Sequence, residues 1–322
     1  MLPANHISFP ELSHQEFQHP LDRDTTGLLK NIDKFRSIIA TLNSYVEHST
    51  RYHHISSCVR VGEKQYPSLY KNYVKLAQTL DVRKLPELYI ETTSEINAFA
   101  SGIEHYSIQL NSALMDILTE REMMAILGHE LGHVKCDHMF YNTFTYFIVY
   151  FGGSITSVIP PPFNSALDIS VQLALLEWSR RAEFSADRAA LLATQDVEAV
   201  TQALSKIAGY SKTLSDPVNV EAIREQADSF EEYVDDNWMA KFIKVQAMLR
   251  QTHPYTVLRV KEILAWAESD QYQQILSGNY RKLSDAPALA TGDPDSPTSG
   301  QKLTSAFSSG LSGLKSFSGL KK

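Results

Sequence analysis

Apolar side chains recur every three to four positions over much of the chain, which is the spacing of helices that bury one face. The first such run extends from Leu21 to Val46, and the second from Tyr66 to Leu80. A third begins at Thr119, where Glu122 completes a capping box, and continues to about His138. Four later runs predict further helices: Asn164–Ala193, Val197–Tyr210, Phe230–Leu249 and Val257–Trp266.

Short segments of a different kind interrupt the helical runs before Thr119. Their length and their β-branched and aromatic content are typical of strands, and Pro86 and Gly102 supply turns. The two segments around Gly102 predict a hairpin. The predicted strands are Ser57–Val61, Glu87–Glu91, Ile96–Ala100 and His105–Leu110. The whole pattern therefore predicts an α+β fold, mainly α-helical, with one small sheet.

Two regions depart from this pattern. Residues 139–167 contain no charged side chain. Within them Phe144–Ile159 is the best candidate for a membrane span, but Gly, Ser and Thr interrupt it, and the alternative is a buried or membrane-dipping hairpin. Residues 283–322 are rich in Ser, Gly, Pro and Ala, which is typical of a disordered tail. Periodic apolar residues at 303–320 could instead form an amphipathic helix on a lipid surface or a partner.

Composition and charge exclude several classes of protein. With 322 residues, 43% hydrophobic and 21% charged, and a net charge of -7, the chain is not collagen-like, wholly disordered or a many-span membrane protein. It has no basic stripe, so nucleic acid is not expected as a partner. Two cysteines, Cys58 and Cys136, are too few for a disulfide scaffold, and residues 1–17 lack the pattern of a signal peptide. We therefore expect a cytoplasmic address.

The helix predicted from Thr119 contains the motif H-E-L-G-H at residues 129–133. His129 and His133 lie one turn apart on one face, so both imidazoles can reach one metal ion, with Glu130 beside the open coordination position. Two histidines and a carboxylate are a catalytic zinc ligand set, which leaves a position for water.

Residues near the motif indicate how it is placed. Gly128 and Gly132 each cost a helix about 1 kcal/mol relative to Ala, so we expect a neighbouring helix or a substrate backbone to need the bare surface there. In a continuous helix His138 is displaced by about 140° from His133. We therefore interpret His138 as a surface or second-layer histidine and not as a metal ligand.

Glu183 is the best candidate for the third metal ligand. It shares one helical face with Asp187, so Glu183 could bind the metal while Asp187 accepts a hydrogen bond from a ligand imidazole. The alternative is a solvated face of ion pairs, since Arg180, Arg181 and Arg188 are near. Spacing alone does not separate the two interpretations.

These segments resemble the M48 family of zinc metallopeptidases, gluzincins that include HtpX and BepA-like proteins. The resemblance rests on four motifs that occur in the family's order over most of Leu85–Ala265. They are H-E-L-G-H-V at 129–134, E-F-S-A-D-R-A-A at 183–190, I-N-A-F-A at 96–100, and His253-Pro254 with Arg259 six residues after His253. The resemblance implies a zincin-like catalytic core at about 85–268. This core would lie within a metallopeptidase domain of residues 1–282, with a helical N-terminal part at about 1–80.

The resemblance also implies roles for individual residues. His129, His133 and Glu183 would bind one Zn²⁺ ion, and Glu130 would be the general acid/base. Asp187 would lie in the layer behind the ligands.

His253 resembles a family histidine close to the zinc, which stabilises the oxyanion or caps the metal, with Arg259 in support. The alternative is that Thr252 and Pro254 simply start the next helix. The resemblance further implies an edge strand on which an extended substrate lies by β-augmentation. Its residues are Asn97, Ala98 and Phe99.

The sequence thus predicts a zinc-dependent endopeptidase that hydrolyses extended or misfolded polypeptides. The chain between His133 and Glu183 must leave and return to one ion, so a shallow or protein-covered hairpin at 139–167 fits better than a single membrane crossing. Peripheral membrane contact is expected there or through 303–322. The alternative function is a latent or non-catalytic, chaperone-like binder of extended chains that uses the same cleft. The family's prenyl-protein processing branch fits poorly, because it needs many spans.

Overall fold

The structure is a computed structural model that describes residues 6–24, 46–140, 142, 169–211, 218–236 and 255–285. Several predictions fall wholly or largely outside these residues. They are most of the helix at Leu21–Val46, the charge-free run at 139–167 with its candidate span Phe144–Ile159, the second half of Phe230–Leu249, His253, and the tail with its candidate helix at 303–320.

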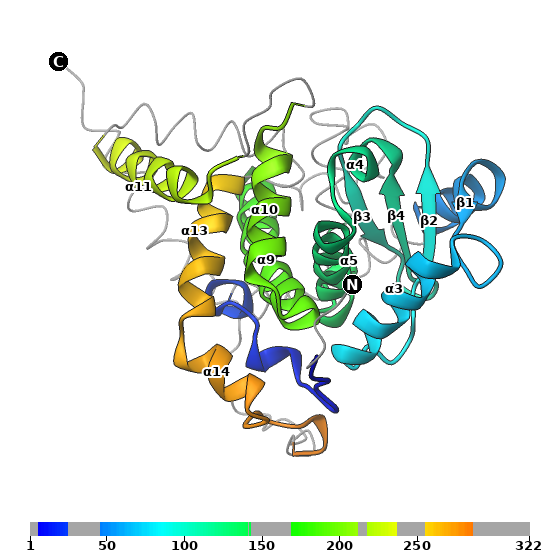
Figure 1. Cartoon of the computed structure of the whole chain (residues 1–322), viewed down its shortest axis with the longest axis horizontal. Helices are drawn as coiled ribbons and strands as arrows, with labels where there is room; N and C mark the ends of the chain where they lie inside the picture. The colour runs from blue at the N-terminus through cyan, green and yellow to red at the C-terminus, as the bar shows by residue number, and fades with distance from the viewer. Residues whose placement is uncertain are drawn as a thin grey trace.

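The predicted small sheet is present, with four strands in the order β1-β2-β4-β3 (Figure 1). Strand β2 pairs in parallel with β4 and antiparallel with β1, and β3 pairs antiparallel with β4. Gly102 joins β3 to β4 with φ +98°, and a Cβ there would lie 2.1 Å from the His105 carbonyl oxygen, so the predicted hairpin needs glycine. The strands are β1 (Val59–Arg60), β2 (Glu87–Glu91), β3 (Ala98–Ser101) and β4 (Ser107–Asn111).

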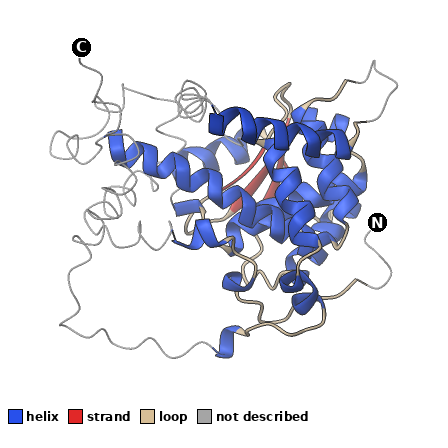
Figure 2. Ribbon diagram, turned by 90° about the vertical axis from the view of Figure 1, so that its left-hand side faces the viewer, coloured by secondary structure: helices blue, strands red, loops and turns tan. Residues whose placement is uncertain are grey.

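The two faces of this sheet have different chemistry because successive side chains alternate between faces. On one face, Leu88 and Ile108 are buried in the main core with α3 (Pro67–Thr79) and α5 (Glu120–Lys135). The other face carries polar groups, among them Gln109, and the helical residues 46–57 lie over it. Helices surround the sheet in the view of Figure 2.

Helix α5 begins with the predicted capping box. The Glu122 backbone N–H donates to Thr119 Oγ1, and the Thr119 N–H donates to Glu122 Oε2 at 2.7 Å. Lys206 Nζ also donates to Glu122 Oε2, at 2.7 Å, so the cap is tied to a neighbouring helix. This end fixes the register of the whole helix and hence the direction in which its later histidines point.

Helix α9 (Ile169–Thr194) packs along α5, which in Figure 1 lies between α9 and the sheet. At Gly132 an added Cβ would come within 2.6 Å of the Ala189 side chain, and at Gly128 within 2.9 Å of the Ala193 side chain. The bare glycine surface therefore accommodates a neighbouring helix, as one of the two predicted alternatives had it. This close approach brings Glu183 of α9 to the motif of α5.

The remaining helices agree with the predicted positions, with four differences. Helix α11 begins at Val220, ten residues before the predicted Phe230, and α4 and α14 were not predicted. Residues 46–57 are helical where no helix was predicted, so the predicted strand Ser57–Val61 is shortened to β1. The ranges are α4 (Ser112–Ile117), α10 (Val197–Ala208), α11 (Val220–Asp236), α13 (Thr256–Ala267) and α14 (Asp270–Leu276). Among the described residues, no helix has both the length and the apolar character that a bilayer crossing needs.

Candidate active site

Three side chains from two helices converge at the α5–α9 contact. His129 and His133 of α5 place their Nε2 atoms 3.2 Å apart. The carboxylate of Glu183 on α9 lies 3.4 Å from His129 Nε2 through Oε2, and 3.3 Å from His133 Nε2 through Oε1. Each side chain is at most 5% exposed. Of the two interpretations of Glu183, the structure favours the metal-ligand one, because its carboxylate faces the two histidines and not a solvated surface.

The donor set fits a single zinc ion. Zinc takes histidine nitrogen and carboxylate oxygen at about 2.0–2.1 Å, and a tetrahedral arrangement then separates neighbouring donors by about 3.3–3.4 Å. The three donor–donor distances here are 3.2, 3.4 and 3.3 Å. The last two distances end on the two different oxygens of the Glu183 carboxylate, so the three groups surround a position that one zinc ion could take. A fourth coordination position would be left to water or substrate.

The other ring nitrogen of His129 is held by Asp187, one turn after Glu183 on α9. His129 Nδ1 and Asp187 Oδ1 are 2.9 Å apart, so we assign the Nδ1–H tautomer, which turns the Nε2 lone pair toward Glu183. Arg259 of α13 donates to both Asp187 oxygens, at 2.6 and 2.7 Å, and its Nη1 lies 3.0 Å from Glu183 Oε2. Arg259 thus fixes both carboxylates with one guanidinium.

His133 is held from behind by a second chain of groups. Its Nδ1 is 3.0 Å from His138 Nδ1, and His138 Nε2 is 3.0 Å from Asp22 Oδ2. With Asp22 ionised, His138 donates from Nε2 and accepts at Nδ1. His133 must then donate from Nδ1, which leaves its Nε2 lone pair directed at the metal position.

His138 is not a surface residue, so that half of the prediction was wrong and the second-layer half was right. Its side chain is fully buried against Trp178. The estimate of 140° assumed a continuous helix, but α5 ends at Lys135 and Asp137 takes a left-handed φ of +58°. The His138 N–H then donates to the His133 carbonyl, and the chain folds back over the motif.

Asp22 was missed by sequence reasoning because it has no pattern to mark it. It lies in the N-terminal segment, more than 100 residues from the motif, and is fully buried. Ser185 Oγ and Gln18 Nε2 also donate to Asp22 Oδ2, at 2.6 and 3.0 Å. The E-F-S-A-D run therefore contributes a second residue, Ser185, beside Asp187 in the layer behind the proposed ligands.

Burial and charge set the protonation of these groups in opposite directions. Burial opposes protonation of His129, but its hydrogen bonds to Asp187 and Glu183 outweigh burial and raise its pKa to about 9. Burial lowers the pKa of His133 to about 3, and the Glu183 hydrogen bond offsets this only in part. Burial would raise the pKa of Asp187, but the Arg259 charge holds that pKa below its ordinary value. Without a metal, His133 is therefore neutral at pH 7 and His129 is protonated. A metal ion bound at His129 Nε2 would displace that proton and leave the Nδ1–H tautomer.

Comparison with known proteins bears on what this site does. Residues 63–267, about two thirds of the chain, match the family model described as Peptidase family M48. The chain belongs to family M48. All of the residues described at this site lie within the matched stretch except Asp22 and Gln18.

Similar proteins carry peptidase names. The chain is 32% identical to a plastoglobule-localized metallopeptidase 48, chloroplastic, from Arabidopsis thaliana, over 86% of this chain and 79% of that protein. It is 31% identical to a protease HtpX homolog from Burkholderia multivorans, over 47% of this chain and 59% of the relative. A protease HtpX homolog from Ralstonia pickettii is 27% identical, over 66% of this chain and 78% of the relative. The chain is accordingly a metalloprotease of the M48 type.

In this M48 protein, strand β3 lies at the edge of the sheet and packs against α5. The Asn111 N–H donates to the Asn97 carbonyl, so the Asn97 backbone faces β4. Because backbone groups alternate, the backbones of Ala98 and Ala100 face away from the sheet. The Ala98 N–H donates instead to the Asn97 side chain, at 3.0 Å. Of the predicted segment, Ala98 offers an outward backbone amide, whereas Asn97 and Phe99 belong to the ladder side.

Of the last two predicted site residues, the structure describes Glu130 but not His253. Glu130 is 2% exposed and follows His129 on α5. His253 lies outside the described residues, so Arg259 is placed here by its contacts with Asp187 and Glu183.

The chain Asp22–His138–His133 leads to a first prediction. Replacing His138 by Ala should weaken zinc binding by about 10–100-fold, because His133 loses the group that fixes its tautomer. Asp22→Asn should act in the same direction. Competition with a chromophoric chelator measures the affinity, with unfolding followed separately. His6→Ala is the control, since His6 bonds the Ala193 carbonyl of α9 away from the site. Unchanged affinity in His138→Ala would contradict the assigned tautomers.

Proposed function

We propose that this M48 protein is a zinc-dependent endopeptidase that cleaves extended or misfolded polypeptides. The observation that carries the proposal is the convergence of His129 Nε2, His133 Nε2 and the Glu183 carboxylate. The imidazole nitrogens lie 3.2 Å apart, and they lie 3.4 and 3.3 Å from Glu183 Oε2 and Oε1. These distances suit zinc, and both imidazoles are oriented from behind by ionised carboxylates.

Different residues of the site would carry out different parts of the reaction. A zinc ion held by the three ligands would supply Lewis acidity, which polarises a peptide carbonyl and favours ionisation of water near pH 7. The Glu130 carboxylate accepts a proton from the attacking water and returns it to the nitrogen of the leaving amine. Asp187 and Arg259 keep His129 and Glu183 in place while this proton moves. Burial of the site limits competing water.

The edge position of β3 supports an extended substrate. An incoming strand can pair with the outward backbone of Ala98 and Ala100, which carries its scissile bond past α5. The Asn97 side chain covers the Ala98 N–H and must swing away first. A folded protein offers few free strands of this kind, so the proposed substrates are extended or misfolded chains.

The same proposal treats residues 1–282 as one metallopeptidase domain. Phe9, Leu12 and Tyr272 share one core, and the Leu283 N–H donates to the Glu11 carbonyl at 2.8 Å. The segments near both ends of this domain thus pack against the same core. Peripheral membrane contact through 139–167 or 303–322, and a cytoplasmic address, stay predictions.

Removal of the metal tests the function. Dialysis against a zinc chelator should abolish casein cleavage, because the three ligands then hold no Lewis acid. One equivalent of Zn²⁺ should restore cleavage, whereas Mg²⁺ should not, since it prefers six oxygen ligands. Metal analysis of each sample is the control. Full cleavage by protein shown to be metal-free would contradict the proposal.

A further inference from the structure

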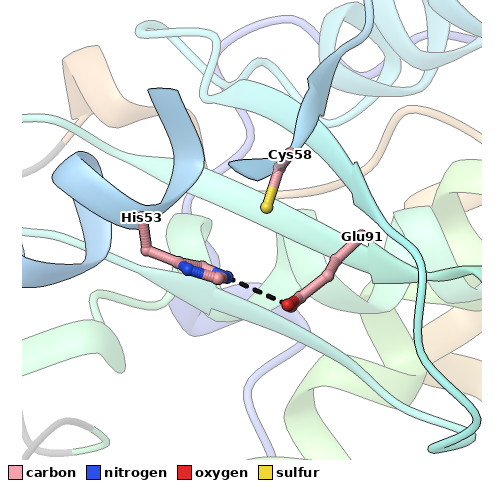
Figure 3. A group of neighbouring side chains, drawn as sticks. All are labelled: His53, Cys58 and Glu91. Atoms are coloured by element: carbon pink, nitrogen blue, oxygen red, sulfur yellow. Dashed lines mark hydrogen bonds and ion pairs between the residues drawn. The ribbon is translucent and has the colours of Figure 1, made fainter. Parts of the chain in front are cut away.

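A second group of metal-binding side chains lies on the far side of the sheet from the α5–α9 contact. It consists of His53, Cys58 and Glu91, one imidazole, one thiol and one carboxylate. Their ligand atoms all lie within 4.8 Å of one another. His53 comes from the helical residues 46–57, Cys58 directly precedes β1, and Glu91 ends β2. Figure 3 shows the three side chains pointing toward one another.

The Glu91 carboxylate is oriented on both oxygens. Gln109 Nε2 of the neighbouring strand donates to Oε2 at 2.6 Å, and His53 Nε2 lies 3.0 Å from Oε1. Gln109 is itself 3% exposed and bonded to His54 at 3.0 Å, so it is fixed under the helix. One carboxylate oxygen is thus held by the protein, and the other is directed at His53 and the space beside Cys58.

The site is open enough to exchange a metal with solvent. The His53 side chain is 45% exposed and that of Glu91 is 29% exposed. The 3.0 Å between His53 Nε2 and Glu91 Oε1 is close to the tetrahedral donor separation of about 3.3 Å. Cys58 Sγ lies within 4.8 Å of the ligand atoms of both His53 and Glu91.

The ligand types select the metal. Thiolate and imidazole together favour zinc over Mg²⁺ and Ca²⁺, which prefer oxygen. A neutral imidazole, a thiolate and a carboxylate carry two negative charges, which balance one Zn²⁺. Binding would release the thiol proton to solvent.

The negative charge of the Glu91 carboxylate lies beside Cys58 and favours a cation there. A divalent cation would remove the repulsion between the Cys58 thiolate and the Glu91 carboxylate.

We propose that His53, Cys58 and Glu91 form a second zinc site, separate from the catalytic one, that fastens residues 46–57 to the β1–β2 edge of the sheet. Water completes the coordination, so the ion is exchangeable. His53 and Cys58 lie outside the stretch that matches family M48. The site would therefore stabilise an element that precedes the stretch matched by the family model.

Cobalt distinguishes the two sites by their ligands. The catalytic set has no sulfur, so a thiolate-to-Co²⁺ charge-transfer band in the near ultraviolet reports on Cys58 alone. Full-length protein freed of metal and loaded with two equivalents of Co²⁺ should show this band. Zn²⁺ should erase it by displacement. Zinc-loaded protein at micromolar concentration is then desalted into a buffer whose free zinc concentration keeps the weaker site occupied. It should hold two zinc ions per chain.

Matched variants identify the ligands. Cys58→Ser should abolish the band and reduce zinc to one ion per chain, while Cys136→Ser, at the only other cysteine, should keep both. His53→Ala and Glu91→Gln should weaken the band, while His48→Ala and Glu87→Gln, on the same elements, should not. Absence of the band in the wild-type protein, its persistence in Cys58→Ser, or a limit of one zinc per wild-type chain would each overturn the second site. None of these results affects the catalytic proposal, which is tested by cleavage.

Discussion

Glu130→Gln should lower the rate of casein cleavage by about 10²–10⁴-fold while the zinc content stays at the wild-type level. Glutamine has nearly the same shape as glutamate but cannot accept the proton of the attacking water at neutral pH. The three proposed ligands are untouched, and Glu130 is already buried beside His129, so the fold should tolerate the change. Initial rates, together with metal analysis of the same preparations, measure the effect.

Glu120→Gln is the matched control for this experiment. Glu120 lies on the same helix, is exposed and accepts a hydrogen bond from Asn72 Nδ2 at 2.9 Å. Its variant should cleave as the wild type does. Wild-type rates in Glu130→Gln would remove Glu130 from the mechanism.

The wild-type protein and Glu130→Gln together also distinguish an enzyme from a chaperone-like binder. An enzyme should capture an unfolded polypeptide in both forms but cleave it only in the wild type. Equal capture with no cleavage by either form would instead favour the non-catalytic alternative. The Asn97 side chain over the Ala98 N–H is the contact to watch in such a capture experiment.

The elements that sequence predicts well are those set by local rules. The capping box at Thr119 and Glu122 starts α5 where expected, and the segment Glu87–Glu91 coincides with β2. The i, i+4 spacing places His129 and His133 on one helical face, as their 3.2 Å separation requires. Local periodicity therefore defines the frame of the site before any tertiary contact is known.

What sequence cannot predict are the groups that tertiary contacts bring in. His138 reaches His133 only because the chain leaves the helix at Asp137 with a left-handed φ. Asp22 reaches His138 from a segment with no motif at all. Arg259 was expected to support His253, yet within the described residues it binds Asp187 and Glu183. Such partners lie far apart along the chain and meet only when the N-terminal segment and the helices pack together, so no local pattern in the sequence predicts them.

Loss of the ion pairs of Arg259 is expected to lower stability more than any other change proposed here. Replacing Arg259 by Met, which keeps much of the side-chain volume, should lower the unfolding free energy of the metal-free protein by about 3–5 kcal/mol. The reason is that Asp187 and Glu183 would keep their negative charges at 3% side-chain exposure without the guanidinium. Arg259→Lys should lose less, because it keeps the charge but not the two-pronged contact.

Zinc should reduce this loss, and that dependence separates a charge effect from lost packing. A dication beside Glu183 supplies part of the positive charge that Arg259→Met removes, whereas a packing defect would be the same with or without metal. Urea unfolding with chelator and with saturating zinc measures the difference. Arg121→Met is the control: Arg121 pairs with Asp196 at 2.6 Å on the surface, where water screens the pair, so its loss should change the unfolding free energy little. An equal loss in Arg259→Met and Arg121→Met, or a loss in Arg259→Met that zinc leaves unchanged, would show that the guanidinium does not balance the charge of the metal site.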